Sequence, residues 1–307
     1  MTDVRTPMDT ARRLLLERAV DLAARRAASP GNLRFTERQL YYETCRVLRP
    51  RPAPVRRVPY SPAPPLRLSR FTEVLRGREP AGMLADEAAG TGEAAEGGEA
   101  AAAAEVAGAA GGVAVATIGG EAREPDLYAY GLPRLLICQD RSIARMLLAN
   151  HVHLEAACPV LSAPDDLPLD PRLAAALERT EGATVHVLHD ASPAGIALPA
   201  RVRAQLGPMA VRVASLGLVP RHARALHLVS GRRPGPPPAL GPLPHGLRPD
   251  EVDWLAAGRF AEVAAVPPAR LLRAVLRLAR GPRSVRHSVR DELRDLRTAG
   301  FLTWPDA

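Results

Sequence analysis

The sequence contains little cysteine and no lysine. Its 307 residues include three cysteines, Cys45, Cys138 and Cys158, and all 41 side chains counted as lysine or arginine are arginine. The cysteines are widely spaced and form no Cys-x-x-Cys pair, which argues against a disulfide scaffold and against a cysteine-bound zinc. We therefore expect a reduced chain that folds without a covalent staple.

Long apolar runs are also missing. The uncharged run 106–120 is rich in Ala and Gly and is too short and too weakly apolar to cross a bilayer. Near the N-terminus, Arg12, Arg13 and Glu17 interrupt the apolar residues that a signal peptide would need. No phosphate-binding or dinucleotide fingerprint is present. These absences predict a cytoplasmic protein that has no membrane partner and no nucleotide-hydrolysing motor.

The charge balance is basic, with a formal net charge of +8 and a pI near 10.3. A basic chain favours an anionic partner, with nucleic acid first. Because every cation is arginine and Ala, Pro and Gly are abundant, part of this basicity reflects compositional bias. The arrangement of the arginines is therefore more informative than their number.

Composition divides the chain into five parts. A stretch of Ala, Gly and Glu is typical of a linker that does not pack, and a Pro/Gly-rich loop follows further on. The parts are a helical, winged-helix-like module (1–84), a low-complexity linker (85–125), an α/β domain (126–230), a Pro-rich loop (231–249) and a helical C-terminal region (250–307).

The most informative stretch is 184–195. Its apolar, β-branched beginning predicts a buried strand that ends at Asp190. Ser192 followed by Pro193 is the pattern of an N-cap and a first helical residue, so we expect a helix over 193–205 with Gly207 after its last turn. Open α/β sheets place their chemistry where a strand turns into a helix in this way.

The same alternation occurs around this stretch. Strands are predicted at 134–138, 157–161 and 210–214, and helices at 142–150 and 171–180. Strands that alternate with helices indicate a parallel sheet flanked by helices. Because right-handed crossovers bring the carboxyl ends of the strands to one edge, Asp140 and Asp190 are expected to lie at the same edge.

Residues 135–218 resemble a Toprim domain, and are most similar to that of the topoisomerase VI A subunit and its meiotic double-strand-break relatives. In that family a glutamate ends the first strand, and an Asp-x-Asp-Pro-x-Gly motif ends a later one. Gln139 stands at the glutamate position here, and the second motif reads Asp190-Ala-Ser192-Pro-Ala-Gly195. The first aspartate matches, and Ser192 replaces the second.

The resemblance implies a Mg²⁺ site at Asp190 and Ser192, with Gln139 in the proton-transfer position. Asp140, one residue beyond the family's position, is the candidate for a second charge at this site. Mg²⁺ gains most from charged carboxylates, and at least one charge of the family's trio is missing, so we expect weakened metal binding. Both flanking residues also have structural interpretations. Ser192 suits an N-cap, and Asp140 suits the first turn of the next helix.

The N-terminal module is expected to hold a helix over 8–27 and a second helix that Thr36 opens in a capping box with Gln39. The second helix resembles the winged-helix segment of the same family, in which a tyrosine attacks a DNA phosphate. The match places Tyr42 at the nucleophile and Arg38 at the family's arginine. Because Arg38 precedes Tyr42 by four residues, we expect the two on the same helical face. In the alternative interpretation, Tyr41 and Tyr42 are core aromatics of a small helical module.

Near the C-terminus, arginines recur at helical spacing within 268–280. Leucine and valine residues cover the other side of the predicted helix, which makes it strongly amphipathic. Either this basic face contacts nucleic-acid phosphates, or it is an ordinary solvated face. The four arginines are Arg270, Arg273, Arg277 and Arg280.

Two hypotheses follow. The first is a DNA-binding protein with a degenerate Toprim-like domain that does not cleave strands, acting as a homodimer or with a partner subunit. The alternative is a topoisomerase-like DNA transesterase that uses Tyr42 and a weakened Mg²⁺ site at Asp190. Histidines near the motif, His186 and His189, are predicted to point to opposite faces of their strand and so not to form a metal pair.

Overall fold

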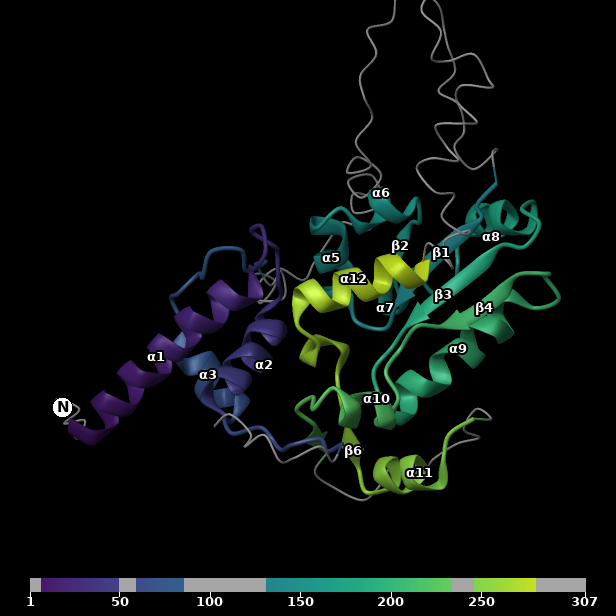
Figure 1. The fold of residues 1–307 in the computed structure, drawn as a ribbon. Helices are drawn as coiled ribbons and strands as arrows, with labels where there is room; N and C mark the ends of the chain where they lie inside the picture. The colour runs from purple at the N-terminus through teal and green to yellow at the C-terminus, as the bar shows by residue number, and fades with distance from the viewer. Residues whose placement is uncertain (1–6, 50–58, 86–130, 234–245, 280–307) are drawn as a thin grey trace, which may run out of the picture.

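A computed structural model of the chain describes residues 7–49, 59–85, 131–233 and 246–279. These residues form an α/β fold in which helices flank a four-stranded parallel sheet (Figure 1). The sheet is built from β1 (Arg134–Cys138), β2 (Val160–Ser162), β3 (Thr184–Leu188) and β4 (Arg212–Ser215). The predicted fold class, a parallel sheet flanked by helices, is confirmed.

The strand order is β2-β1-β3-β4, and all pairs are parallel. β1 and β3 are therefore the two central strands, with Cys138 level with Leu188. Because their carboxyl ends are in register, Asp140 and Asp190 follow neighbouring strands at the same edge, as predicted. We call this part of the molecule, residues 139–140 and 189–190, the carboxyl edge.

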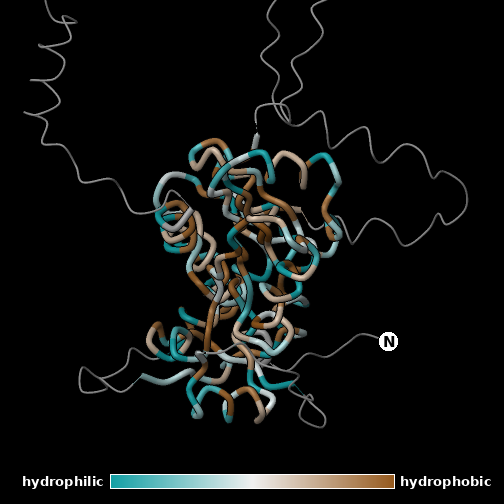
Figure 2. The backbone as a smooth tube through the Cα atoms, turned by 90° about the vertical axis from the view of Figure 1, so that its right-hand side faces the viewer, coloured by the Kyte–Doolittle hydropathy of each residue, from teal (hydrophilic) through white to brown (hydrophobic). Residues whose placement is uncertain are grey.

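Each face of the sheet packs on its own set of helices. Leu136 and Cys138 belong to a core shared with α5 (Arg141–Ala149), α6 (Val152–Ala156) and α12 (Pro268–Ala279). Leu135 and Ile137 belong to a second core shared with α8 (Pro171–Glu178) and α9 (Pro193–Leu206). Alternating side chains of one strand thus supply both cores, and hydrophobic segments run through the interior (Figure 2).

The first core continues into the N-terminal helices. It includes residues of α1 (Pro7–Ala27), α2 (Glu37–Leu48) and α3 (Leu68–Leu75). In residues 7–49 and 59–85 these helices are accompanied by one isolated bridge, between Phe35 and Met83, and by no strand. The helical part of the N-terminal prediction is confirmed, whereas the winged helix is not.

The remaining elements return the chain to the carboxyl edge. α10 (Pro220–Ala225) is followed by a small antiparallel pair, β5 (Gly231–Arg232) and β6 (Arg259–Phe260), with α11 (Pro249–Ala256) between its strands. A bridge then joins Ala191 to Ala261, and the short 3₁₀ helix η3 (Val263–Ala265) leads into α12. A short helix, α7 (Ala163–Asp166), follows β2.

Element boundaries differ from the predictions at several places. β2 begins at Val160, so Cys158 precedes the strand, and β4 begins two residues later and ends one residue later than predicted. Nearly all of the predicted linker (85–125), Arg280 and the rest of the predicted C-terminal helical region beyond it lie outside the described residues. In the part of the chain that the structure describes, no helix is both long enough and apolar enough to cross a membrane.

Candidate functional site

At the carboxyl edge, Gln139 and Asp190 are joined by a hydrogen bond. The backbone N–H of Asp190 donates to Gln139 Oε1 over 2.9 Å. Gly195 makes this contact possible, because a Cβ at that position would lie 2.4 Å from the Asp190 carbonyl oxygen and 2.5 Å from Gln139 Oε1. Gln139 therefore locks the strand-to-helix turn and does not extend toward a substrate.

The Asp190 carboxylate is used in the same way. Its Oδ1 accepts the backbone N–H of Val263 over 2.7 Å, which ties the end of β3 to η3. Burial is the main reason that the pKa of Asp190 rises to about 7; Glu262 and Asp140 also raise it, while the Val263 N–H and Arg38 oppose the rise. A carboxyl with such a pKa carries a proton for part of the time at neutral pH, which weakens it as a cation ligand.

Asp140 and Ser192 serve as helix caps. Asp140 Oδ1 accepts the N–H groups of Ser142 and Ile143 at 2.7 and 3.2 Å, together with the Ser142 hydroxyl at 2.6 Å. Ser192 Oγ accepts the N–H of Gly195 at 3.1 Å. The structural interpretations of both residues are therefore confirmed. Their side chains accept free backbone N–H groups at the N-termini of α5 and α9.

Arg38 extends from α2 toward this edge and pairs with Glu262. Its Nε and one terminal nitrogen each donate to a different Glu262 oxygen over 2.6 Å, in a bidentate geometry. The guanidinium carbon also lies 5.5 Å from the centre of the Tyr42 ring. The predicted proximity of Arg38 and Tyr42 on one helical face is confirmed. Asp190 lies near Arg38 and Glu262, since both side chains affect its pKa.

Tyr42 is nearly inaccessible, with 3% of its surface exposed. Burial and the Glu262 carboxylate raise its pKa well above the ordinary value, although Arg38 opposes the shift. A nucleophilic phenol needs a lowered pKa and access to a phosphate. Tyr41, whose hydroxyl donates to the Leu66 carbonyl over 2.7 Å, packs edge-on against Phe71. Both tyrosines belong to the hydrophobic core, as the alternative interpretation predicted.

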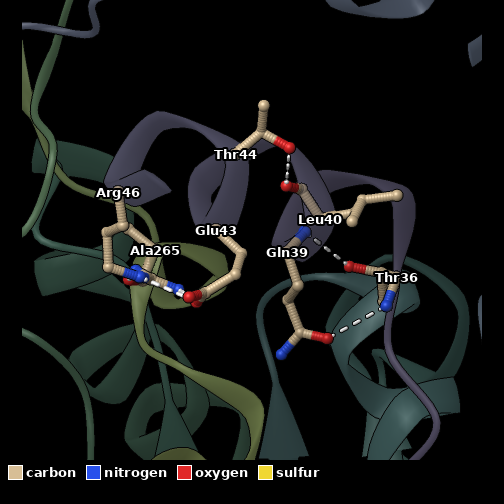
Figure 3. A network of polar contacts seen from close by, with 7 residues as sticks. All are labelled: Thr36, Gln39, Leu40, Glu43, Thr44, Arg46 and Ala265. Carbon is tan, nitrogen blue, oxygen red and sulfur yellow. Dashed lines mark hydrogen bonds and ion pairs between the residues drawn. The ribbon is translucent and has the colours of Figure 1, made fainter. Parts of the chain in front are cut away.

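Polar contacts lie along α2, and one of them reaches the Ala265 carbonyl of η3 (Figure 3). Thr36 and Gln39 form the predicted capping box, since each side chain accepts the other's backbone N–H. Two turns further on, Arg46 pairs with Glu43 and donates to the Ala265 carbonyl over 2.6 Å. α2 thus contacts η3 through Arg46, and contacts Glu262, the residue before η3, through Arg38.

The donor set is a poor one for a Mg²⁺ ion. Oδ1 of Asp140, Oδ1 of Asp190 and Oγ of Ser192 already accept backbone N–H groups. Glu262, which sequence reasoning did not find, is bound on both oxygens by Arg38. Among the described residues, no group of three or more His, Cys, Asp or Glu side chains is arranged to hold a metal ion. The committed oxygens are those of Gln139, Asp140, Asp190 and Ser192.

The two motif histidines have separate surroundings, consistent with their predicted opposite directions. His189 contacts the Asp190 carbonyl at 2.9 Å and the Ser215 hydroxyl at 2.8 Å, and Gly217 packs against its ring. His186 is 6% exposed, and its Nδ1 has no hydrogen-bond partner. Burial lowers the pKa of both rings, so both are neutral at pH 7.

The basic helix of the prediction is α12. Arg270, Arg273 and Arg277 are exposed, while Leu271, Leu272 and Val275 on the other side are buried in the first core. We call the three exposed residues the arginine face. Arg273 donates to the carbonyl of Ala269 in its own helix, and no ion pair with a described residue neutralises any of the three.

Sequence reasoning missed Glu262 and Val263. They lie more than 70 residues beyond Asp190, in an apolar stretch without a motif, and the Ala191–Ala261 bridge, together with the Val263–Asp190 hydrogen bond, brings them to the carboxyl edge. No pattern at their own positions indicates the contact, because it depends on how the loop after β6 folds back.

Comparison with protein-family models, with curated proteins and with solved structures found no match to this chain.

Proposed function

We propose that this chain is a DNA-binding protein with a degenerate Toprim-like domain, and that it does not cleave strands. The observation that carries the proposal is the arginine face of α12, which presents to solvent three guanidinium groups that no acidic side chain of the described residues neutralises. Arginine is suited to phosphate because its donors form a planar fork. The basic net charge of the chain adds a long-range attraction for a polyanion.

The carboxyl edge supports the second half of the proposal. Asp190 and Gln139 hold the turn after β3, and Arg38 faces Glu262 where a divalent cation would need free oxygens. Tyr42 is buried with a raised pKa. The residues that the Toprim resemblance connects with cleavage therefore have structural partners here. The resemblance itself, a homodimer or partner subunit and a cytoplasmic location stay predictions.

The test is the affinity for a fluorescent DNA duplex, measured by anisotropy at several salt concentrations. The variant Arg270→Gln/Arg273→Gln/Arg277→Gln removes the arginine face. Its matched control, Arg18→Gln/Arg25→Gln/Arg26→Gln, removes the same charge from exposed positions of α1. We expect the α12 variant to bind at least tenfold more weakly and to lose about 2–3 from the salt slope, since each phosphate contact contributes about 0.9. Equal losses in both variants would contradict the proposal.

A DNA transesterase is the second candidate, because Arg38 lies close to the Tyr42 ring and also acts on the Asp190 carboxyl. It requires α2 to separate from η3 so that Tyr42 becomes accessible. Incubation with nicked or supercoiled DNA and Mg²⁺, followed by denaturation, would trap a covalent adduct that Tyr42→Phe abolishes. We expect no adduct; a Tyr42-dependent one would replace the first candidate by the second.

A further inference from the structure

Two arginines flank a threonine in one row across the sheet. Arg134 of β1 is level with Thr184 of β3, and Thr184 is level with Arg212 of β4. Residues paired in neighbouring strands point to the same side of the sheet. Arg134 points to the same side of β1 as Leu136 and Cys138, which share the first core with α12, whereas Leu135 and Ile137 point to the second core. The row, which we call the sheet-face row, therefore lies on the α12 side of the sheet.

The two guanidinium groups of this row have no counter-charge among the described residues. In the described part of the chain, no hydrogen bond or ion pair engages either side chain. Arg212 is exposed and Arg134 half-buried, while Thr184 between them is 6% exposed. With strands about 4.8 Å apart, the two arginine Cα atoms are separated by about 10 Å, so a single anion between them is within reach of both long side chains.

His186 is the next residue of β3 on the same face, level with Leu136 and Ala214. Its Nδ1 is buried without a partner, which is rare for a buried polar atom and calls for an explanation. The ring is close to both arginines, since each contributes to the lowering of its pKa. A row of two unpaired cations therefore stands beside a neutral imidazole that has an unused nitrogen.

We propose that the sheet-face row, with His186 beneath it, is a binding site for a phosphate group. Two guanidinium forks supply charge-assisted donors, which is the chemistry that phosphate oxygens select. Thr184 has a hydroxyl between them that contacts the Gly182 carbonyl at 3.3 Å and can turn to the ligand. The site is separate from the arginine face, so it can exist whether or not α12 binds DNA.

The phosphate has two possible sources, a nucleic-acid backbone or a small phosphate-bearing molecule such as a nucleotide. α12 covers the same side of the sheet (Figure 1), so a strand that follows α12 could place one phosphate in the row. The chemistry of recognition is the same for both sources, and competition between them distinguishes the two.

The experiment is a titration of the full chain with inorganic phosphate, followed through the imidazole signals of ¹⁵N-histidine and by calorimetry. We compare the wild type with Arg134→Gln, Arg212→Gln and the double variant. Arg172→Gln/Arg201→Gln is the control, because both of these arginines are exposed on helices that cover the opposite face. Circular dichroism confirms that each variant is folded.

We expect saturable binding that weakens about tenfold for each arginine lost from the row, no change in the control, and a rise in the His186 pKa when phosphate binds. Displacement of phosphate by a single-stranded oligonucleotide identifies a backbone ligand, and displacement by a mononucleotide alone identifies a small one. Binding that does not saturate, or that the double variant retains in full, would overturn the proposal. A His186 signal that phosphate leaves unmoved would overturn the part assigned to His186.

Discussion

At the scale of single residues, the polar side chains that a cleavage site would need form structural hydrogen bonds with the backbone at or next to the carboxyl edge. Asp190 is the clearest case, because its carboxylate is both buried and bound to the backbone of a distant segment. Such a residue contributes to folding in a way that depends on pH, and this dependence can be measured.

The first prediction concerns the pH dependence of stability at Asp190. Its pKa rises from 3.8 in the unfolded chain to about 7 in the fold, so the folded state holds the proton more tightly. Its contribution is therefore complete below pH 3.8 and is lost as pH rises toward 7, by up to about 1.4 kcal/mol per unit. Urea unfolding of the wild type and Asp190→Asn across this range should give a difference that falls with pH. A difference that is flat or rises would contradict the assignment.

The second prediction concerns Gly195. A methyl group there would lie within 2.5 Å of Gln139 Oε1 and of the Asp190 carbonyl, so the turn must open. We expect Gly195→Ala to lower the free energy of unfolding by about 1–3 kcal/mol, as overpacking usually does.

The control for this effect is the background Gln139→Ala, which removes one of the two clashing atoms. There the same Gly195→Ala substitution should cost less, and the difference should appear as a coupling energy in a double-mutant cycle. Equal costs in the two backgrounds would show that Gln139 does not set the shape of the turn.

At the scale of elements, the important contact is that of α2 with η3. It joins residues more than 200 positions apart, through the Arg38–Glu262 pair and through Arg46 on the Ala265 carbonyl. Arg38 and Glu262 keep 32% and 20% of their side-chain surface exposed, so the pair is only partly screened by water and should be worth more than a surface pair.

The third prediction is a coupling energy of about 1–3 kcal/mol between Arg38→Gln and Glu262→Gln, measured from urea unfolding of both single variants and the double. The pair Arg13–Glu17 on the exposed part of α1 is the comparison, with about 0.3–0.5 kcal/mol expected for such a helical pair. If both cycles give the same small value, the contact does not hold α2 in place.

The elements also show what sequence could and could not predict. The turn after β3 follows local rules, since Ser192 caps α9, Pro193 begins it and Gly207 ends it, and the central strands follow from apolar β-branched runs. The N-terminal capping box was predicted for the same local reason. The ends of β2 and β4 were misplaced because these strands are short and lie at the two margins of the sheet, where fewer neighbours constrain them.

The site was predictable to the same limit. Spacing correctly placed Asp140 beside Asp190 and Arg38 beside Tyr42, because strand ends and helical turns are local geometry. Glu262 and Val263 were not predictable, since their contacts depend on a long-range return of the chain. Val263 binds the Asp190 carboxylate and Glu262 binds Arg38. Without these two contacts, the sequence alone could not distinguish a metal site from a structural contact at the carboxyl edge.

At the scale of the whole molecule, the described residues contain two separate features. The carboxyl edge joins secondary-structure elements, and the arginines of α12 and of the sheet form no ion pair with a described residue. The arginine face of α12 and the sheet-face row lie on the same side of the sheet. The central claim is that the residues resembling the acidic Toprim motif stabilise the fold, and that anions bind at the arginine face and the sheet-face row instead.

The most direct test of this claim is a Mn²⁺ titration of the full chain, with free ion followed by electron paramagnetic resonance, beside the variant Asp190→Asn. Mn²⁺ accepts the same oxygen ligands as Mg²⁺, and no partner subunit is needed. We predict no binding below millimolar Mn²⁺ and identical curves for the two proteins, because one oxygen of each edge carboxylate already accepts a backbone N–H and burial raises the pKa of Asp190. Micromolar binding that Asp190→Asn abolishes would contradict the account and restore a metal-dependent strand-breaking enzyme.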